Sequence, residues 1–227
     1  MPGRTNISTI FASVFLPDGN HLLAADSLGR LFVWEMNRLL EASYWEEAAE
    51  GHKPGPFLTH KLHDCSIFCL NLLSADVLLT GADDSIKVWK LSSLVTAGAT
   101  PQLVATITHP QETLGRGAVM PVAETNGLAA NASRSHFISA AGDGIGYVWD
   151  STTMQCKGKL QGHTDYLHCV GCEGENTAVT GSEDGTVRIW DVRERSGDEL
   201  PLSGGSPKAW VGALDVEQEG NWVQHTP

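Results

Sequence analysis

The side chains best suited to chemistry by type and spacing are His163, Thr180 and Asp184. A histidine at this position could serve as a base or as a metal ligand. The same stretch carries Trp190, whose indole N–H needs an acceptor once it is buried. Because buried polar groups are normally satisfied inside the protein, we interpret these four residues as one hydrogen-bonded set and His163 as structural. The alternative for His163 is a ligand or a base.

Cys169 and Cys172 form a C-x-x-C motif, a spacing that occurs in zinc sites. We find no second such pair and no histidine at ligand spacing from it. We therefore interpret the pair as a strand cysteine beside a turn cysteine.

Gly142, Gly144 and Gly146 have a spacing that could suggest a dinucleotide-binding loop. The further glycine spacing and the following helix of such a loop are missing. We interpret the segment as a hairpin turn.

The elements that must position the histidine set lie in one stretch, Leu160 to Arg193. Its apolar runs predict three strands, and Glu183-Asp184-Gly185 predicts a tight turn between the second and the third. The third strand ends in the dipeptide Trp190-Asp191, which is the signature of a WD-repeat propeller blade. The strands are expected at Tyr166 to Val170, Ala178 to Ser182 and Val187 to Trp190.

The same pattern recurs along the chain and predicts an all-β WD-repeat β-propeller with about four blades and part of a fifth. The first blade departs most, because Leu28 stands where Asp184 is expected and no histidine precedes it. The predicted blades span 8–62, 63–109, 122–160 and 161–203, and a fifth begins within 208–227. In the second blade the expected set is His63, Thr80, Asp83 and Trp89, with Asp84 as the alternative to Asp83. In the third blade the expected set is Ser139, Asp143 and Trp149, and we find no matching histidine.

The connections between blades differ in composition. Residues 37–51 are rich in Ala, Leu and Glu and predict a helix, in which Trp45 is either a cap on the blade edge or a partner contact. Residues 92–122 predict a long loop with one outer strand at Leu103 to Thr108. The polar, Gly- and Ser-rich run 194–208 predicts a loop.

Composition narrows the possible functions. The formal net charge of −12 argues against a free-standing nucleic-acid binder, because phosphate binding needs a basic face. No apolar run approaches the roughly 18 residues of a membrane span, and the first ten residues lack a signal-peptide core. Five cysteines, an odd number, favour a reducing compartment over a disulfide framework. We expect an intracellular protein.

Four blades and part of a fifth are not expected to close a ring. An open propeller exposes a strand edge and a blade face, and both favour pairing with other chains. We therefore expect the sequence to be a fragment or a truncated gene product, and the isolated chain to be poorly soluble or self-associating.

The run Gly117 to Asp150, together with LQGHTDYLHCV and TGSEDGTVRIWD of the fourth blade, resembles the THO complex subunit 6 family of WD-repeat proteins, most closely in its plant and green-lineage form. The resemblance implies a seven-bladed propeller, of which this sequence covers about the first four blades. It also implies a nuclear scaffold subunit of the THO/TREX assembly, which acts in messenger RNA processing and export. It implies no catalytic, cofactor-binding or metal-binding residues and no direct strong contact with nucleic acid.

The stretch Ala178 to Arg193 also resembles the box by which some WD-repeat proteins bind the adaptor of cullin-4 ubiquitin ligases. That resemblance implies a substrate receptor, with Asp191 and Arg193 as possible partner-docking residues. Asp184, Trp190 and Asp191 are equally explained by blade structure, so Arg193 alone is informative.

Overall fold

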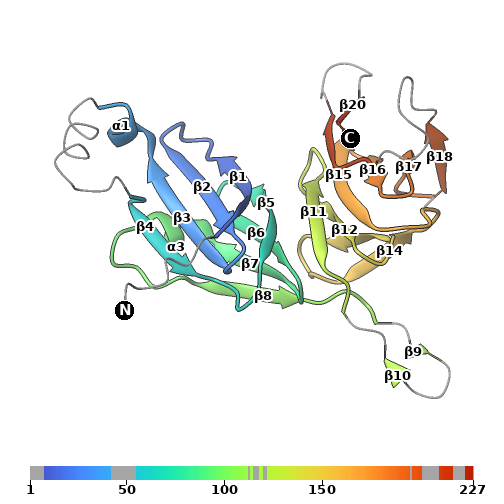
Figure 1. Cartoon of the computed structure of the whole chain (residues 1–227), viewed down its shortest axis with the longest axis horizontal. Helices are drawn as coiled ribbons and strands as arrows, with labels where there is room; N and C mark the ends of the chain where they lie inside the picture. The colour runs from blue at the N-terminus through green and yellow to red at the C-terminus, as the bar shows by residue number, and fades with distance from the viewer. Residues whose placement is uncertain are drawn as a thin grey trace, which may run out of the picture.

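The computed structural model describes residues 8–41, 55–111, 113–114, 118–119, 122–194, 196–200, 210–216 and 223–226. These residues form four antiparallel four-stranded sheets, and each sheet uses its strands in chain order. Figure 1 shows the sheets following one another from the N-terminal one at the left to the C-terminal one at the right. The predicted all-β class is confirmed, and each sheet is a local unit built from one continuous stretch of chain.

The strands have the following bounds. Sheet 1 contains β1 (Ile10–Phe15), β2 (His21–Asp26), β3 (Arg30–Glu35) and β4 (Leu58–Lys61), and sheet 2 contains β5 (Ile67–Ser74), β6 (Val77–Ala82), β7 (Ile86–Lys90) and β8 (Leu103–Ile107). Sheet 3 contains β11 (Thr125–Ala130), β12 (His136–Ala141), β13 (Gly146–Asp150) and β14 (Cys156–Leu160), and sheet 4 contains β15 (Leu167–Glu173), β16 (Thr177–Ser182), β17 (Val187–Asp191) and β18 (Ser196–Leu200).

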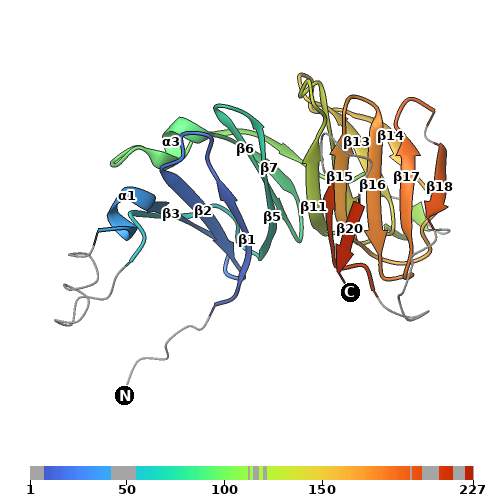
Figure 2. The ribbon, with the colours of Figure 1, turned by 90° about the horizontal axis from the view of Figure 1, so that it is seen from above.

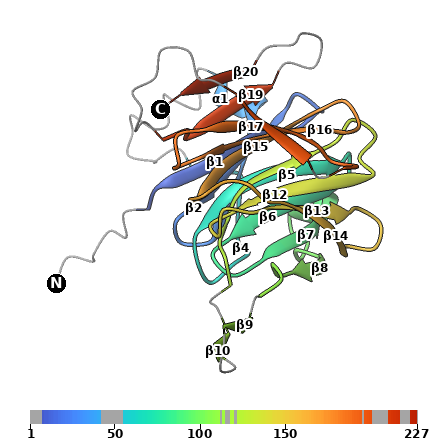
Figure 3. The same cartoon turned by 90° about the vertical axis from the view of Figure 1, so that its right-hand side faces the viewer.

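Smaller elements complete the described fold. The strands β19 (Ala213–Val216) and β20 (Val223–Thr226) pair beside sheet 4. The strands β9 (Thr113–Leu114) and β10 (Ala118–Val119) form a short hairpin that projects away from the sheets in Figures 1 and 3. The described helices, α1 (Met36–Leu39) and α3 (Leu91–Val95), have four and five residues. Neither has the length or the apolar character needed to cross a membrane.

The sheets pack face against face, with their first strands as neighbours. Contacts join β1 to β5, β5 to β11, β11 to β15 and β15 to β19, and Figure 2 shows this succession from above. The second strands β6, β12 and β16 are buried along nearly their whole length, because a sheet covers each of their faces. Each blade therefore depends on its neighbours for its core.

The core consists of separate apolar layers between consecutive sheets. Leu31 and Leu78 share the first layer, Leu79 and Phe137 the second, and Ile138 and Ala178 the third. These side chains are fully buried. Burial of this kind stabilises by about 1.5–3 kcal/mol for each large apolar side chain, so stacking the sheets is the main source of stability.

The loop that leads from one sheet to the next packs against the turn between the second and third strands of the first of them. This close contact requires a glycine in the turn. Gly29 has a φ of 72°, and a Cβ on it would lie 2.1 Å from the carbonyl oxygen of His63. Gly144 has a φ of 79°, and a Cβ there would lie 2.9 Å from the carbonyl oxygen of Asp165. Only a residue without a side chain fits both the turn and the close approach.

Two expectations from composition need correction. The polar run 194–208, predicted as a loop, contains the strand β18, whose main chain pairs with β17 from Asp191↔Ser196 to Val187↔Leu200. An outermost strand pairs through its backbone on one side, so a polar composition does not prevent it. The helix predicted at 37–51 begins as α1 but ends at Leu39 among the described residues, and residues 42–54 with Trp45 lie outside them.

Candidate functional site

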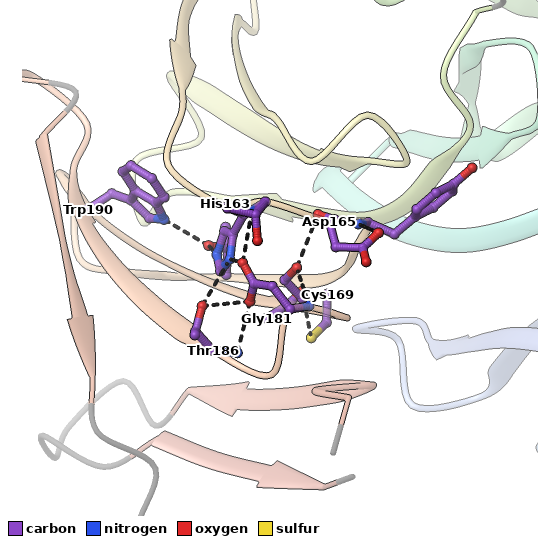
Figure 4. A network of polar contacts seen from close by, with 11 residues as sticks. His163, Asp165, Cys169, Gly181, Thr186 and Trp190 are labelled. Carbon is purple, nitrogen blue, oxygen red and sulfur yellow. Dashed lines mark hydrogen bonds and ion pairs between the residues drawn. The ribbon is translucent and has the colours of Figure 1, made fainter. Parts of the chain in front are cut away.

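The structure brings His163, Thr180, Asp184 and Trp190 into one connected network in sheet 4. The indole Nε1–H of Trp190 donates to Thr180 Oγ1 at 2.8 Å, and Thr180 Oγ1 lies 2.8 Å from His163 Nε2. On the other side of the ring, His163 Nδ1 lies 2.8 Å from Asp184 Oδ2. Figure 4 shows the imidazole of His163 with these contacts around it. Every group has a partner when the ring carries its proton on Nδ1 and the threonine hydroxyl donates to Nε2.

Strand register places these side chains. Thr180 lies in the middle of β16. Trp190 of β17 pairs with Ala178, which lies two residues before Thr180, so the side chains of Thr180 and Trp190 point to the same face of the sheet. His163 lies in the loop after β14, and Asp184 lies in the turn between β16 and β17. The network therefore joins the loop that enters the sheet to the hairpin within it.

Asp184 is the ionised end of the network. Burial raises its pKa, but hydrogen bonds from the Thr186 side chain, the backbone N–H of Thr164 and His163 outweigh burial and lower the pKa to about 2. The carboxylate also accepts the backbone N–H of Thr186 at 2.9 Å. A carboxylate with several donors is held as an anion in one orientation, which in turn orients the histidine ring.

An aspartate, a histidine and a hydroxyl in sequence have the order of a nucleophilic triad. The hydroxyl of Thr180 cannot serve as a nucleophile here, because the residue is 0% exposed and its oxygen already accepts the Trp190 indole. A substrate could not reach it without unpacking the sheet. The arrangement therefore supports a structural role.

Sheet 2 repeats the centre of this network around His63. His63 Nε2 lies 2.7 Å from Thr80 Oγ1, which also accepts the Trp89 indole at 3.1 Å. The acidic partner differs, because Asp83 accepts the backbone N–H of Ser66 at 3.1 Å instead of contacting the ring. The nearer carboxylate belongs to Asp84, whose Oδ1 lies 4.0 Å from His63 Nδ1 and is too distant for a hydrogen bond.

Sheet 3 has a histidine after all, His109, which the sequence analysis missed. Its Nε2 lies 2.8 Å from Ser139 Oγ, which accepts the Trp149 indole at 2.9 Å. Its Nδ1 lies 2.9 Å from the carbonyl oxygen of Ala123. Asp143 does not take part, because it accepts the Tyr147 hydroxyl at 2.5 Å.

The spacing to the preceding outer strand could have identified His109. The three histidines follow the ends of β4, β8 and β14 by two or three residues. The distance to the following strand is misleading, because residues 110–124 separate His109 from β11. The histidine is thus placed by the strand before it.

Sheet 1 replaces the set with an ion pair. Ala24 stands where Thr180 stands in sheet 4, and the buried carboxylate of Asp26 accepts Arg30 Nη2 at 2.6 Å and Nε at 2.8 Å. Burial raises the pKa of Asp26, and hydrogen bonds led by that of the Arg30 side chain lower it below its usual value. The first blade therefore lacks the histidine set, as expected, and has an ion pair between Asp26 and Arg30 in its place.

Asp191 and Arg193 lie at the opposite end of sheet 4 from His163. Arg193 is exposed, and its guanidinium donates to both carboxylate oxygens of Asp191, at 3.0 Å and 2.5 Å. Arg193 also lines a pocket of about 270 Å³ between sheets 3 and 4 with His136, Lys157 and Asn176. The two predicted docking residues are therefore paired with each other at the surface.

Both cysteines of the C-x-x-C motif lie in β15 of sheet 4. Cys169 Sγ contacts the carbonyl oxygens of Val211 at 3.5 Å and Gly181 at 3.9 Å. Burial raises the pKa of both Cys169 and Cys172 to about 12, so both are neutral thiols. A neutral, buried thiol behaves as a small apolar side chain.

Comparison with known proteins identifies the repeats. The family model "WD domain, G-beta repeat" matches residues 55–90 and 154–191. Each match begins with the outer strand of one sheet (β4 or β14) and ends with the third strand of the next (β7 or β17), so one repeat joins two sheets. The crystal structure of RRP9 WD40 repeats is similar over 87% of this chain and 52% of that one, with a TM-score of 0.64 and 19% identity. The chain therefore contains WD repeats and has the fold of a β-propeller, and its four sheets are blades 1 to 4.

Among curated proteins the chain is similar to THO complex subunit 6. It is 29% identical to the homolog from Danio rerio over 82% of this chain and 54% of that protein. It is 28% identical to THO complex subunit 6 of Homo sapiens, over 82% of this chain and 51% of that protein. It is 26% identical to THO complex subunit 6 of Arabidopsis thaliana, over 82% of this chain and 56% of that protein. The chain spans about half the length of these relatives. The resemblance inferred from the sequence is confirmed: the chain contains WD repeats and is similar to THO complex subunit 6 proteins.

Proposed function

We propose that the chain acts as a non-enzymatic scaffold subunit of a THO/TREX-type assembly in the nucleus, where it takes part in messenger RNA processing and export. The observation that carries this proposal is the similarity to THO complex subunit 6 proteins over 82% of the chain in fish, human and plant. With a net charge of −12, the chain contacts RNA through its protein partners.

The chemistry of the blade networks supports a role without catalysis. Thr80, Ser139 and Thr180 are each 0% exposed, and each hydroxyl oxygen accepts a tryptophan indole. The same hydroxyl oxygens lie within hydrogen-bond distance of Nε2 of His63, His109 and His163. The groups that most resemble a catalytic set are thus committed to holding blades together.

An aromatic patch on the rim that carries His163 supplies a surface for a protein partner. Trp210 is 58% exposed and stacks on His168 with ring centroids 5.9 Å apart. His168 in turn contacts Glu183 at 2.7 Å, and the backbone N–H of Glu183 donates to the carbonyl oxygen of Tyr166, which is 43% exposed. Exposed Trp and Tyr side chains dominate binding energy at protein interfaces. We propose that this patch contacts another subunit of the assembly.

The ubiquitin-ligase alternative has no comparable support. The curated relatives that share 82% of the chain are named for the THO complex. The feature that suggested the alternative, Arg193 beside Asp191, is explained by their mutual ion pair. We therefore retain the scaffold function.

Affinity purification of the tagged chain from nuclear extract, followed by mass spectrometry, tests the proposal. THO subunits are expected to co-purify with the chain. The double variant Tyr166→Ala, Trp210→Ala should reduce their recovery at an unchanged melting temperature, and Arg193→Ala, on the opposite rim, is the matched control. Recovery of a cullin adaptor without THO subunits would overturn the proposed function. Full recovery with the double variant would overturn the assignment of the patch.

A further inference from the structure

His63, Cys65 and Asp84 bring three metal-ligating atoms together in blade 2. His63 Nδ1, Cys65 Sγ and one oxygen of Asp84 all lie within 4.8 Å of one another. Cys65 Sγ is 3.5 Å from Asp84 Oδ1, and His63 Nδ1 is 4.0 Å from the same oxygen. Two ligands come from the loop that enters the blade and one from the hairpin between β6 and β7. Among the residues that the structure describes, this is the group of three ligand-type side chains close enough to share one ion.

A second observation points to a ligand at this place. His63 Nδ1 is buried without a hydrogen-bond partner in the described structure, and the side chain of His63 is 0% exposed. The equivalent nitrogen has a partner at 2.9 Å in blade 3 and at 2.8 Å in blade 4. A buried polar atom without a partner is costly, so a native structure that contains one calls for an explanation. The atom faces Asp84 and Cys65.

The donor set selects the kind of ion. Imidazole, thiolate and carboxylate together suit Zn²⁺ and related divalent transition metals better than Mg²⁺ or Ca²⁺. Tetrahedral zinc bonds of about 2.0–2.3 Å place ligand atoms about 3.3–3.7 Å apart. The 3.5 Å between Cys65 Sγ and Asp84 Oδ1 already fits this range, and the 4.0 Å between His63 Nδ1 and Asp84 Oδ1 must shorten. The side chain of Asp84 is 68% exposed, which leaves an entry path and room for a water as fourth ligand.

We propose that His63, Cys65 and Asp84 bind one Zn²⁺-class ion, which ties the entry loop of blade 2 to its hairpin. On binding, the Cys65 thiol releases its proton to solvent, and a metal–sulfur bond replaces the contact between Sγ and Asp84. The thiolate and the carboxylate together neutralise the divalent charge, so the nearby Lys87, which donates to the Leu62 carbonyl at 2.9 Å, faces a neutral complex. The ion supplies the link that Asp184 supplies directly in blade 4. This site departs from the sequence-based expectation of no metal.

Titration of the metal-free full chain with Co²⁺ tests the proposal, because cobalt reports thiolate ligation and tetrahedral geometry by its absorption. One equivalent is expected to bind with a sulfur-to-cobalt band and to raise the melting temperature, and Zn²⁺ should displace it. Cys65→Ser should abolish the band, and Asp84→Asn should weaken binding by at least about tenfold. Cys156→Ser and Asp83→Asn are the matched controls and should bind like the unaltered chain.

Three outcomes would overturn the site. These are the absence of a stoichiometric cobalt spectrum, a band that survives Cys65→Ser, or a band lost with Cys156→Ser. Cys65 lies in the entry loop and Asp84 in the hairpin, so one of the two variants still tests the site if the other does not fold. The readout is independent of partner binding, so the metal site and the scaffold function succeed or fail separately.

Discussion

Blades 2 and 4 share a histidine, a threonine and a tryptophan in the same contacts, yet their carboxylates differ. In blade 4, Asp184 lies 2.8 Å from the imidazole, whereas in blade 2 the nearest carboxylate lies 4.0 Å away. The hairpin explains the difference, because Thr80 and Trp89 are nine residues apart and Thr180 and Trp190 are ten. Strand register thus positions the centre of the network, and turn length positions its acidic end.

Removing the shared hydroxyl should have the largest effect in both blades. Thr180→Val or Thr80→Val leaves a buried indole N–H and an imidazole nitrogen without a partner, at about 1–3 kcal/mol each. We therefore expect each variant to lower the free energy of unfolding by about 2–6 kcal/mol, measured by urea denaturation. Thr152→Val, at an exposed position, is the control. An effect in only one blade would mean that the two centres are not equivalent.

Removing the carboxylate should separate the two blades. Asp184→Ala removes the acceptor that lies 2.8 Å from His163 Nδ1 and that also accepts from Thr164 and Thr186, and it should cost about 1–3 kcal/mol. In the metal-free chain, Asp84→Ala should cost less than about 0.5 kcal/mol, because Asp84 is largely exposed and does not bond the ring. Thermal melts of both variants after chelation measure the difference. Equal losses would contradict the distinction between the two turns.

As the pH falls, the stabilising contribution of His109 should be lost before that of Asp184. Burial keeps the pKa of His109 below its ordinary value of 6.5, so the unfolded chain takes up a proton first and stability falls as the pH drops below about 6.5. The contribution of Asp184 is present above about pH 3.8 and is lost only as the pH falls toward 2. His109→Gln should therefore reduce the slope of melting temperature against pH between 7 and 5. Asp184→Asn should leave that slope unchanged, and the reverse pattern would refute the assignment.

The smallest effect is expected at the rim opposite the histidines. Arg193→Ala removes an exposed ion pair with Asp191, so the melting temperature should not change measurably. Its co-purification with THO subunits should also stay intact. A melt and a pull-down of the same preparation provide both measurements, and loss of THO binding without a stability change would move the partner surface to this rim.

The amino-acid sequence alone predicted the class of fold and the centres of the networks in blades 2 and 4. Strand and turn patterns with the Trp-Asp dipeptide are local signals, and a blade is a local unit, so His163, Thr180 and Trp190 could be grouped before the structure was known. The same reasoning located Ser139 and Trp149 in blade 3. Each of these contacts depends on strand register within one sheet.

Features that depend on loop paths, ion pairs and backbone pairing became visible only in the three-dimensional structure. His109 reaches Ser139 across an insertion, Asp26 is paired with Arg30 in place of a histidine set, and β18 exists because β17 offers it an edge. The choice of Asp84 over Asp83 beside His63 followed from the path of one turn, which a single missing residue redirects. Sequence periodicity carries no information on loop paths or on backbone pairing of polar strands, so packing alone could settle these points.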